Sequence, residues 1–427
     1  MGILWDRLVV VTRSTPLRAA ALALLLAGCP WLASAPATAG PAPTAGIVRL
    51  LPTPVSVFGD KLRRAAAATP AGQFPIEARP GAASWTTAGG WHWAAGFVPG
   101  QLWELYRSTH DPQWRRLAQA MDTTLPREAR DPRPHDLGFM LASPYVPAYE
   151  STHDPRYASL LRTAAATLDG HWRPAPGVLW SWPAAPGQTR VIVDSLMNME
   201  LLFWAAEHGG SPTLAAHARS HVLRLAHDAM RPDGSTVHVL DYDNASGALL
   251  RTSTAQGFSD DSAWARGQAW FFTGLTQAYA HTHDARLLAA ARTSARYYVD
   301  HLPADGVPYW DLSMPVGTST SRDTAAGAVG AYGLRLLAAA DPASAGSWRA
   351  AADRALYGLL QPPYLAAAAH PAVLTFAAHG QKGVAIQQET SFPYGDYYLL
   401  KAMLAAPPLT PSWRWGRGTG TLEVARR

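Results

Sequence analysis

Two aspartates that directly precede apolar, helix-like stretches are the strongest candidates for chemistry in this chain. Asp136 begins the sequence Asp-Leu-Gly-Phe-Met, and Asp194 follows the sequence Val-Ile-Val. A single aspartate at such a place usually caps the helix with its side chain. An aspartate directly after Val-Ile-Val is expected to be buried, and a buried carboxyl group needs a partner or a raised pKa. Capping is therefore the weaker interpretation for Asp194, and it stays open for Asp136.

A second group of residues could recognise an acidic sugar. Arg266 and Trp270 are four residues apart and share one face of a predicted helix. An arginine can grip a carboxylate with two hydrogen bonds, and an indole ring can cover the apolar face of a sugar. Trp93 adds an aromatic side chain at another helix start. The alternative is structural: for residues taken alone, a salt-bridged arginine and a core tryptophan are the more frequent outcome.

Several common kinds of functional site are excluded. The chain contains no H-E-x-x-H motif, P-loop, G-x-S-x-G elbow or Rossmann fingerprint. Its single cysteine, Cys29, excludes a disulfide framework and any cysteine-based zinc or iron–sulfur site. The glycine-rich segment 416–420 has no flanking strand and helix that would make it a nucleotide loop. We therefore predict neither a metal ion nor a cofactor.

Composition places the chain among globular proteins without a nucleic-acid partner. Its 427 residues are 48% hydrophobic, which is enough for a large core. Charged residues make up 16%, below the usual ~25%. The formal net charge is +5, and residues 1–39 contribute three arginines against one aspartate. The charge on the remainder is too small to indicate a polyanionic partner.

The elements that must position these residues are helices. Apolar residues recur with a 3.6-residue period in ten segments: 97–106, 114–121, 156–168, 195–208, 214–230, 268–281, 285–301, 324–340, 347–360 and 396–404. Long alternating runs are missing, and only 235–239 and 249–253 suggest a small hairpin across the turn at 241–247. The fold class is therefore all-α.

A short repeat separates successive helices. Ser-Thr-His-Asp-Pro occurs at 108–112 and 151–155, Thr-His-Asp-Ala-Arg at 282–286, and looser copies at 208–212 and 340–343. The His-Asp pairs could suggest metal binding, but a tight turn followed by an Asp or Ser cap and an early proline explains them better. Each copy then joins two helices of a hairpin.

The hairpins predict an (α/α)6 toroid, a closed barrel of about six helical hairpins. Five hairpins and one unpaired helix at each end give close to twelve helices, which could stack as a solenoid or close into a ring. Long, tryptophan-rich loops at 122–150, 169–193, 231–263 and 302–323 favour the ring. In that case the loops at one end build the active site.

The combined motifs resemble the unsaturated glucuronyl hydrolases, glycoside hydrolase family 88. The resemblance covers residues 90 to 405, and the elements that carry it are Trp93-x-x-x-Phe97, His135-Asp136-Leu137-Gly138-Phe139, the 192–198 stretch, the 257–270 stretch, Val307-Pro308-Tyr309-Trp310-Asp311, Asp323-Thr324-Ala325-Ala326 and Tyr394-Gly395-Asp396-Tyr397-Tyr398. Two departures are Ser195-Leu196 after Asp194 and the 312–315 stretch, where a further acidic residue is expected. The second departure puts that loop in doubt, but not the reaction.

The resemblance implies a hydrolase that acts on oligosaccharides left by polysaccharide lyases. In these substrates the non-reducing uronate carries a C4=C5 double bond. The enzyme hydrates that vinyl ether, and the resulting hemiketal opens and releases the sugar. By the resemblance Asp194 is the acid and base, and Asp136 tunes it and contacts the substrate. The residues expected to line the uronate subsite are Trp93, His135, His238, Gln256, Arg266, Trp270 and Trp182. Trp182 is the weaker candidate, because Trp180 is only two residues away and could take the same place.

Other functions remain to be weighed against this one. The unsaturated rhamnogalacturonyl hydrolases share the barrel and the second aspartate, but the His135-Asp136 pair and Arg266 favour the glucuronyl branch. A non-catalytic sugar-binding lipoprotein would not need both carboxylates, and a helical-repeat adaptor would not explain 17 tryptophans gathered largely at loops and helix starts. Whether the protein is a monomer or a homo-oligomer stays open.

The N-terminus resembles a bacterial export signal. A basic stretch ends at Arg18 and a short apolar run at 19–27 follows, too short to span a bilayer. Leu-Ala-Gly-Cys at 26–29 resembles a lipoprotein signal in which Cys29 is acylated, whereas the small residues at 33–35 or 37–39 suit ordinary signal peptidase. Both interpretations stay open, and we expect either a periplasmic enzyme or an outer-membrane lipoprotein.

The chain thus divides into four predicted segments. Residues 1–29 form the export signal, and the Ala- and Pro-rich residues 30–48 form a linker. Residues 49–410 form the (α/α)6 catalytic domain, and residues 411–427 a flexible tail.

Overall fold

Helices form most of the computed structural model, which describes residues 52–315, 317, 321–405, 414–415 and 422–423. The predicted export signal, the linker and Cys29 lie outside the described residues. Within the predicted tail, the described residues are the short paired strands β10 (Arg414–Trp415) and β11 (Leu422–Glu423). Among the helices that the structure describes, none combines the length and apolar character needed to cross a bilayer.

Twelve α-helices occur in the described part of the chain. They are α1 (Pro54–Ala68), α2 (Phe97–Thr109), α3 (Pro112–Met121), α4 (Ser143–Thr152), α5 (Pro155–Asp169), α6 (Ser195–Glu207), α7 (Pro212–Asp228), α8 (Ala265–Thr282), α9 (Ala285–Asp300), α10 (Thr324–Ala340), α11 (Ala345–Leu359) and α12 (Pro393–Leu404). Three short helical turns accompany them: the 3-10 helices η2 (Leu125–Arg130) and η4 (Pro342–Ser344), and the π-helix η3 (Gly138–Ala142).

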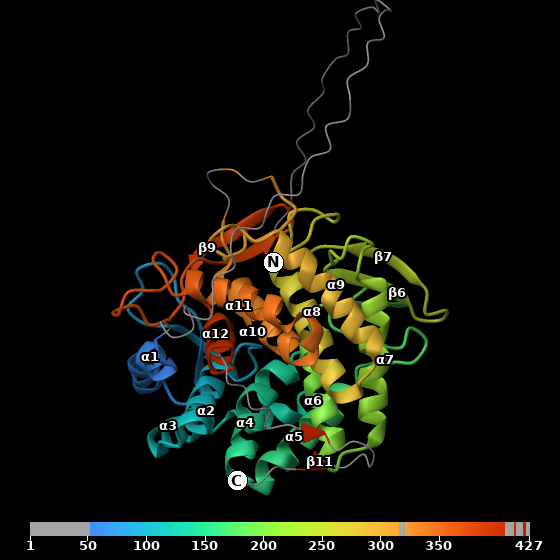
Figure 1. Cartoon of the computed structure of the whole chain (residues 1–427). Helices are drawn as coiled ribbons and strands as arrows, with labels where there is room; N and C mark the ends of the chain where they lie inside the picture. The colour runs from blue at the N-terminus through green and yellow to red at the C-terminus, as the bar shows by residue number, and fades with distance from the viewer. Residues whose placement is uncertain (1–51, 316, 318–320, 406–413, 416–421, 424–427) are drawn as a thin grey trace, which may run out of the picture. The chain divides into compact units, whose positions relative to one another are not determined.

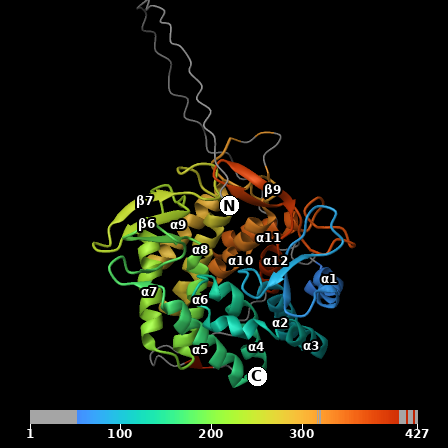
Figure 2. The same ribbon diagram turned by 180° about the vertical axis from the view of Figure 1, so that it is seen from behind.

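The even-numbered helices form a closed inner ring. α2 packs on α4, η3 joins α4 to α6, and α6, α8, α10 and α12 follow in order until α12 packs back on α2. The odd-numbered helices pack outside this ring. Among them, α1 packs against both α2 and α12, which lie next to each other (Figures 1 and 2). The predicted (α/α)6 toroid is confirmed, and the helices at the two ends of the catalytic unit pair with each other.

Burial explains which helices are inside. Ten of the thirteen residues of α6 are buried, and most of α10 is buried as well. A helix that is apolar on all sides is stable only when it is surrounded by protein. In α3 only Trp114, Ala118 and Met121 are buried, at the spacing of a single face, so this helix covers the ring from outside.

The repeated His-Asp motif makes the turns between helices. His110, His153 and His283 adopt left-handed conformations, with φ of 57°, 52° and 51°, and end their helices. The following aspartates, Asp111, Asp154 and Asp284, cap the next helices by accepting hydrogen bonds from backbone N–H groups. The prediction of turn chemistry in preference to metal binding is confirmed.

Five small antiparallel sheets occur among the described residues. The remaining strands are β1 (Gln73–Glu77), β2 (Thr86–Gly89), β3 (Trp172–Arg173), β4 (Val178–Leu179), β5 (Gln188–Ile192), β6 (Val239–Asp243), β7 (Leu249–Ser253), β8 (Ala377–Gln381) and β9 (Val384–Thr390). The predicted hairpin is present, but its first strand begins at Val239. The residues before Val239 do not join the strand, because the backbone N–H and the hydroxyl group of Thr236 both donate to Gln268 Oε1.

The predicted loop 122–150 is more ordered than expected. It contains η2, η3 and most of α4. Pro144 stands in the first turn of α4, where a proline is tolerated, but Pro147 lies inside the helix. Because two prolines are unusual in so short a helix, the sequence pattern did not predict α4.

Candidate active site

The N-terminal ends of the inner helices meet at one end of the ring. Trp93 precedes α2, Asp136 precedes η3, Asp194 precedes α6, and Arg266 lies in the first turn of α8. Ring contacts connect these ends: Trp93 lies 5.8 Å from Phe139, and Phe139 lies 5.2 Å from Trp270. The predicted placement of the site at one end of the barrel follows from this convergence.

Asp194 occupies a helix-capping position without capping the helix. It connects β5 to α6, and its side chain accepts no capping hydrogen bond. Its Oδ2 atom is buried and has no hydrogen-bond partner among the described residues. Burial, with a further contribution from Asp136, raises the pKa of Asp194 to about 7, against an opposing effect of Arg266. This carboxyl group can therefore carry a proton near neutral pH.

The sheet register brings His238 next to Asp194. Ile192 pairs with Val239, and the Val193 N–H donates to the His238 carbonyl. His238 Nδ1 accepts N–H bonds from Ala255 and Gln256, so the proton of the neutral ring is on Nε2. Nε2 lies 3.7 Å from Asp194 Oδ2. Because burial lowers the pKa of His238 to about 3, the ring is neutral and presents a donor.

Asp136 is held in place by Asn198 of α6. Asn198 Nδ2 donates to Asp136 Oδ1 at 3.1 Å, and Asn198 Oδ1 accepts from the Phe139 N–H at 3.0 Å. Gly138 permits this approach, since a Cβ there would lie 2.6 Å from the Asn198 Cα. Burial raises the pKa of Asp136 to about 7, although the hydrogen bond from Asn198 lowers it. Asp136 and Asp194 are thus two coupled groups that share a titration range.

His135 and Trp182 complete this side of the site. His135 Nε2 lies 3.3 Å from Asp136 Oδ2, while its buried Nδ1 has no hydrogen-bond partner among the described residues. The Trp182 ring lies 6.4 Å from His135 and 5.8 Å from His238, so it stands between the two histidines. Trp180 instead stacks on His171 at 4.0 Å. The geometry thus favours Trp182 over Trp180.

Arg266 is bound by protein groups. It forms a buried ion pair with Asp323 at the start of α10 and donates to the Ala378 carbonyl at 2.8 Å. Its Nη2 donates to Gln256 Oε1 at 3.1 Å. Burial would lower the pKa of Arg266, but Asp323, Tyr394 and Asp194 together outweigh this effect and the net pKa is raised. Gln256 and Arg266, which were both predicted to line the uronate subsite, are therefore bonded to each other, and the salt-bridge alternative describes one side of the guanidinium.

Aromatic side chains form one wall of the site. Trp270 is 1% exposed and lies among Phe139, Tyr394 and Tyr398. Trp93 is partly exposed and lies 4.9 Å from the Tyr394 ring. Trp270 therefore supports the wall from within the core, whereas Trp93 presents a surface. Asp323 and Tyr394 were recognisable from the sequence only as parts of motifs, and a buried position at a helix start was the available signal for both.

Asp311 organises the loop that carries Gln256. One of its oxygens, Oδ2, accepts the Phe258 N–H at 2.8 Å and the Ser262 hydroxyl at 2.6 Å. Its other oxygen, Oδ1, accepts the Ser313 N–H at 3.0 Å. The 312–315 stretch, where a further acidic residue was expected, thus contributes Ser313 to this arrangement.

The other departure, Ser195, has a partner on α7. The Ser195 hydroxyl donates to the Ile192 carbonyl at 2.6 Å and lies 2.8 Å from His221 Nε2. His221 Nδ1 accepts the Leu179 N–H, which places the proton on Nε2. The histidine therefore donates to the serine and cannot act as its base. This pair anchors the first turn of α6, directly after Asp194.

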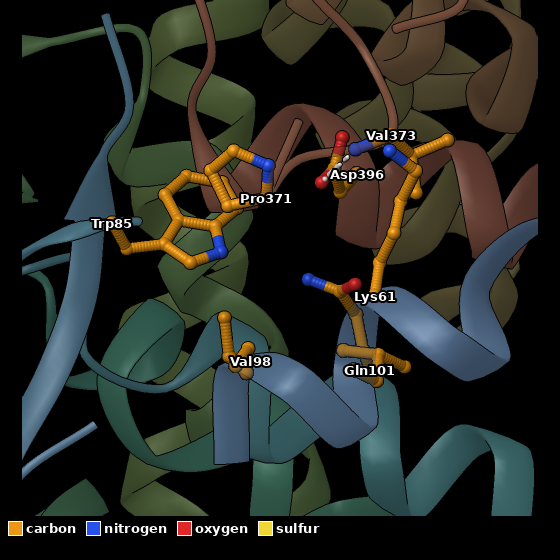
Figure 3. A pocket seen from close by; sticks show the side chains of 9 residues that line it. Lys61, Trp85, Val98, Gln101, Pro371, Val373 and Asp396 are labelled. Carbon is orange, nitrogen blue, oxygen red and sulfur yellow. Dashed lines mark hydrogen bonds between the residues drawn. The ribbon is translucent and has the colours of Figure 1, made fainter. Parts of the chain in front are cut away.

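A small cavity lies beside the site at the start of α12. Lys61 of α1, Val98 and Gln101 of α2, and Asp396 of α12 line its 10 Å³ volume, with Trp85 across from Lys61 and Asp396 (Figure 3). Asp396 accepts the N–H groups of Val373 and Leu374. The cavity is large enough for about one water molecule, so a sugar cannot enter it.

The described residues contain no group of three or more His, Cys, Asp or Glu side chains placed to hold a metal ion. The chemistry available from these residues is that of two carboxyl groups with raised pKa values, one neutral histidine donor and an arginine. Such a set can move a proton to and from a bound molecule and hold a carboxylate or hydroxyl group.

Comparison with known families agrees with this arrangement. The sequence model of Glycosyl Hydrolase Family 88 matches residues 75–312. This chain belongs to that family. The match contains all nine residues predicted to form the site, from Trp93 to Trp270.

Two curated proteins are about one third identical to this chain over the residues that align. An unsaturated glucuronyl hydrolase of Formosa agariphila is 33% identical over 56% of this chain and 60% of its own length, so the match spans less than two thirds of that protein. An unsaturated chondroitin disaccharide hydrolase of Streptococcus pyogenes is 31% identical over 73% of this chain and 80% of its own length.

Solved structures of family 88 share the toroid. An unsaturated glucuronyl hydrolase specific for heparin superimposes with a TM-score of 0.78 and 30% identity, over 85% of this chain and 97% of the other. The unsaturated glucuronyl hydrolase of Bacillus sp. GL1 gives a TM-score of 0.77 and 27% identity, over 83% and 97%. The family assigned from the sequence and the toroid seen in the structure therefore agree.

Proposed function

We propose that this protein removes the terminal 4,5-unsaturated glucuronic acid from lyase-generated oligosaccharides. The proposal rests on membership of family 88 and on the relatives named for unsaturated glucuronyl and chondroitin disaccharide substrates. The observation that carries it is Asp194: a buried carboxyl group with a pKa of about 7 that caps nothing and faces a neutral histidine. A purely structural carboxyl group would be paired.

The reaction begins with proton transfer from Asp194 to C4 of the uronate. Positive charge develops at C5 and is shared with the ring oxygen, and a water molecule adds to C5. The second proton of that water passes to the Asp194 carboxylate, which restores the acid. The product is a hemiketal at C5. Its bond from C5 to the ring oxygen breaks to give a ketone, and the hemiacetal left at C1 then releases the sugar.

The surrounding residues assist each stage. His238 Nε2–H can donate to the Asp194 carboxylate once its proton has left, and it cannot compete as an acid because its pKa is lowered to about 3. Burial and, in addition, Asp136 raise the pKa of Asp194, so that the proton is present near neutral pH. The partly exposed Trp93 ring is available to the sugar ring.

A direct assay tests the proposal. Hydration destroys the conjugated enoate, so turnover appears as loss of ultraviolet absorbance when the protein is mixed with lyase-generated disaccharides. We expect loss of absorbance with disaccharides that carry an unsaturated glucuronate. Turnover of only those in which rhamnose follows the uronate would indicate the rhamnogalacturonyl branch, and binding without turnover would indicate a sugar-binding protein.

We also propose that the protein is exported from a bacterial cell. The basic stretch ending at Arg18 and the apolar run at 19–27 support this location. Acylation at Cys29 would attach the protein to the outer membrane, whereas cleavage after Ala35 or Ala39 would leave it free in the periplasm.

A further inference from the structure

Trp91 is the most exposed large apolar side chain in the described part of the protein. Its side chain is 61% exposed, whereas the other exposed residues of this kind, including Tyr357 at 48% and Phe258 at 38%, are more covered. Leaving an indole ring in water is unfavourable. An exposed indole ring offers a flat surface that can cover the apolar face of a sugar.

The Trp91 ring is held in one position despite its exposure. It packs across Gly89 at the end of β2, where a Cβ would lie only 2.9 Å from the Trp91 Cδ1 and Nε1 atoms. The ring of His92 meets it edge-on at 5.8 Å. His92 is itself fixed, because its Nδ1 accepts the Ala94 N–H. A ring fixed before binding loses little freedom when a ligand covers it.

Trp91 lies at the rim of the candidate active site. It is two residues before Trp93, and the ring contacts continue from Trp91 to His92 and from His92 to Trp93 at 6.3 Å. The adjacent Gly90 packs against Glu128, in the segment that leads to Asp136, since a Cβ at Gly90 would lie 3.1 Å from Glu128 Oε1. Trp91 thus lies on the segment that enters α2, and the adjacent Gly90 contacts the segment that leads to η3.

We propose that Trp91 is a stacking platform for a sugar beyond the unsaturated uronate, further along the same oligosaccharide. The proposal rests on the proposed function, which places the uronate itself beside Trp93 and Asp194. The C–H face of a pyranose ring is apolar and pairs well with an indole ring. A platform at the rim increases the affinity for longer substrates and leaves the reacting end in the same place.

The experiment compares two substrates with the same terminal unsaturated uronate, a disaccharide and a tetrasaccharide. In Trp91→Ala we expect the ratio of kcat/KM for the tetrasaccharide to that for the disaccharide to fall about three- to tenfold, through KM, as expected for one lost aromatic contact. Trp91→Phe retains most of the ratio. Tyr357→Ala removes an exposed aromatic side chain from α11 and leaves the ratio unchanged.

Two results overturn the inference. One is an unchanged ratio in Trp91→Ala protein that melts at the wild-type temperature. The other is a ratio that responds to Phe258→Ala alone, which would put the platform on the loop of Gln256. If the wild-type protein turns over neither substrate, the proposed function fails separately. Calorimetric binding of the tetrasaccharide then decides on Trp91, and equal affinity of Trp91→Ala and wild type refutes the platform.

Discussion

His238 Nε2 lies 3.7 Å from Asp194 Oδ2, and a β-sheet register sets this separation. β5 and β6 pair Ile192 with Val239, so the residues just beyond the pair, at the start of α6 and before β6, face each other. The Nδ1 bonds of His238 fix the tautomer that points a proton at Asp194. The acid and its neutral donor are therefore placed by backbone hydrogen bonds, which tolerate substitution of either side chain.

This placement predicts that Asp194→Asn abolishes turnover without unfolding the protein. The amide cannot deliver a proton, and general acid catalysis contributes roughly 10²–10⁴ in rate. Its side chain caps no helix, so the melting temperature should stay within a few degrees of wild type. The measurement is enoate loss together with circular dichroism. Asp60→Asn, at an 85% exposed carboxylate, serves as the control; a well-folded Asp194→Asn protein with activity within a few-fold of wild type contradicts the assignment.

The raised pKa values predict how activity depends on pH. Asp194 must be protonated to act, and its pKa is raised from 3.8 to about 7, so kcat/KM should fall as pH rises above about 7. Asp136 contributes to that shift by repulsion. Asp136→Asn removes the repulsion, lowers the pKa of Asp194 and moves the falling limb to lower pH in the residual activity. A limb that stays at the same pH in this variant would show that another group titrates.

Local patterns predicted the helices well because those patterns act within a few residues. The period of apolar residues placed α10 at its observed bounds, and the Val-Ile-Val sequence indicated the burial of the Asp194 carboxyl group, whose Oδ2 atom is covered. Contacts made by ring closure could not be predicted this way. The Trp93–Tyr394 contact joins the first and last inner helices, and the Arg266–Asp323 pair joins α8 to α10. Neither has a signal in the intervening sequence.

The Arg266–Asp323 ion pair is buried, so removal of one partner should destabilise the protein. Asp323→Asn leaves a buried guanidinium without its counter-ion and should destabilise the protein by about 3–5 kcal/mol in urea unfolding.

Arg266→Lys cannot reproduce the bonds to Gln256 and Ala378. The substitution should lower kcat/KM by an amount that corresponds to about 1–3 kcal/mol of lost transition-state binding. The loss should be smaller for a substrate whose uronate is esterified. Equal losses for the free acid and the ester would make Arg266 a structural residue.

The leader predicts a membrane-bound form that depends on one residue. If Cys29 is acylated, Cys29→Ala should release the protein from the membrane fraction of the producing cell. The mature N-terminus of the wild-type protein, mapped by mass spectrometry, should then begin at a lipid-modified Cys29. A mature N-terminus directly after Ala35 or Ala39, with unchanged fractionation of the variant, would instead identify an ordinary exported enzyme.

A charged cluster between α6 and α8 lies far from the reacting residues. His281 of α8 lies between two glutamates of α6, with Nδ1 2.7 Å from Glu207 Oε1 and Nε2 3.2 Å from Glu200 Oε2. Burial would lower the pKa of His281, but the two glutamates raise it to about 10. Arg266 begins the same helix, fifteen residues and about 22 Å away. The cluster therefore affects stability without touching the site.

Because the folded pKa of His281 lies above the unfolded value, its contribution to stability is fully present below about pH 6.5 and is lost as pH rises through about 10. His281→Gln should reduce the free energy of unfolding at pH 7 by about 1–3 kcal/mol, since both glutamates are partly exposed. In the variant, the free energy of unfolding should decline less between pH 6.5 and 10, and kcat/KM should stay at the wild-type value. His227→Gln, at an 87% exposed histidine, should change neither slope nor stability. Parallel pH profiles for His281→Gln and wild type would show that the histidine is neutral in the folded protein.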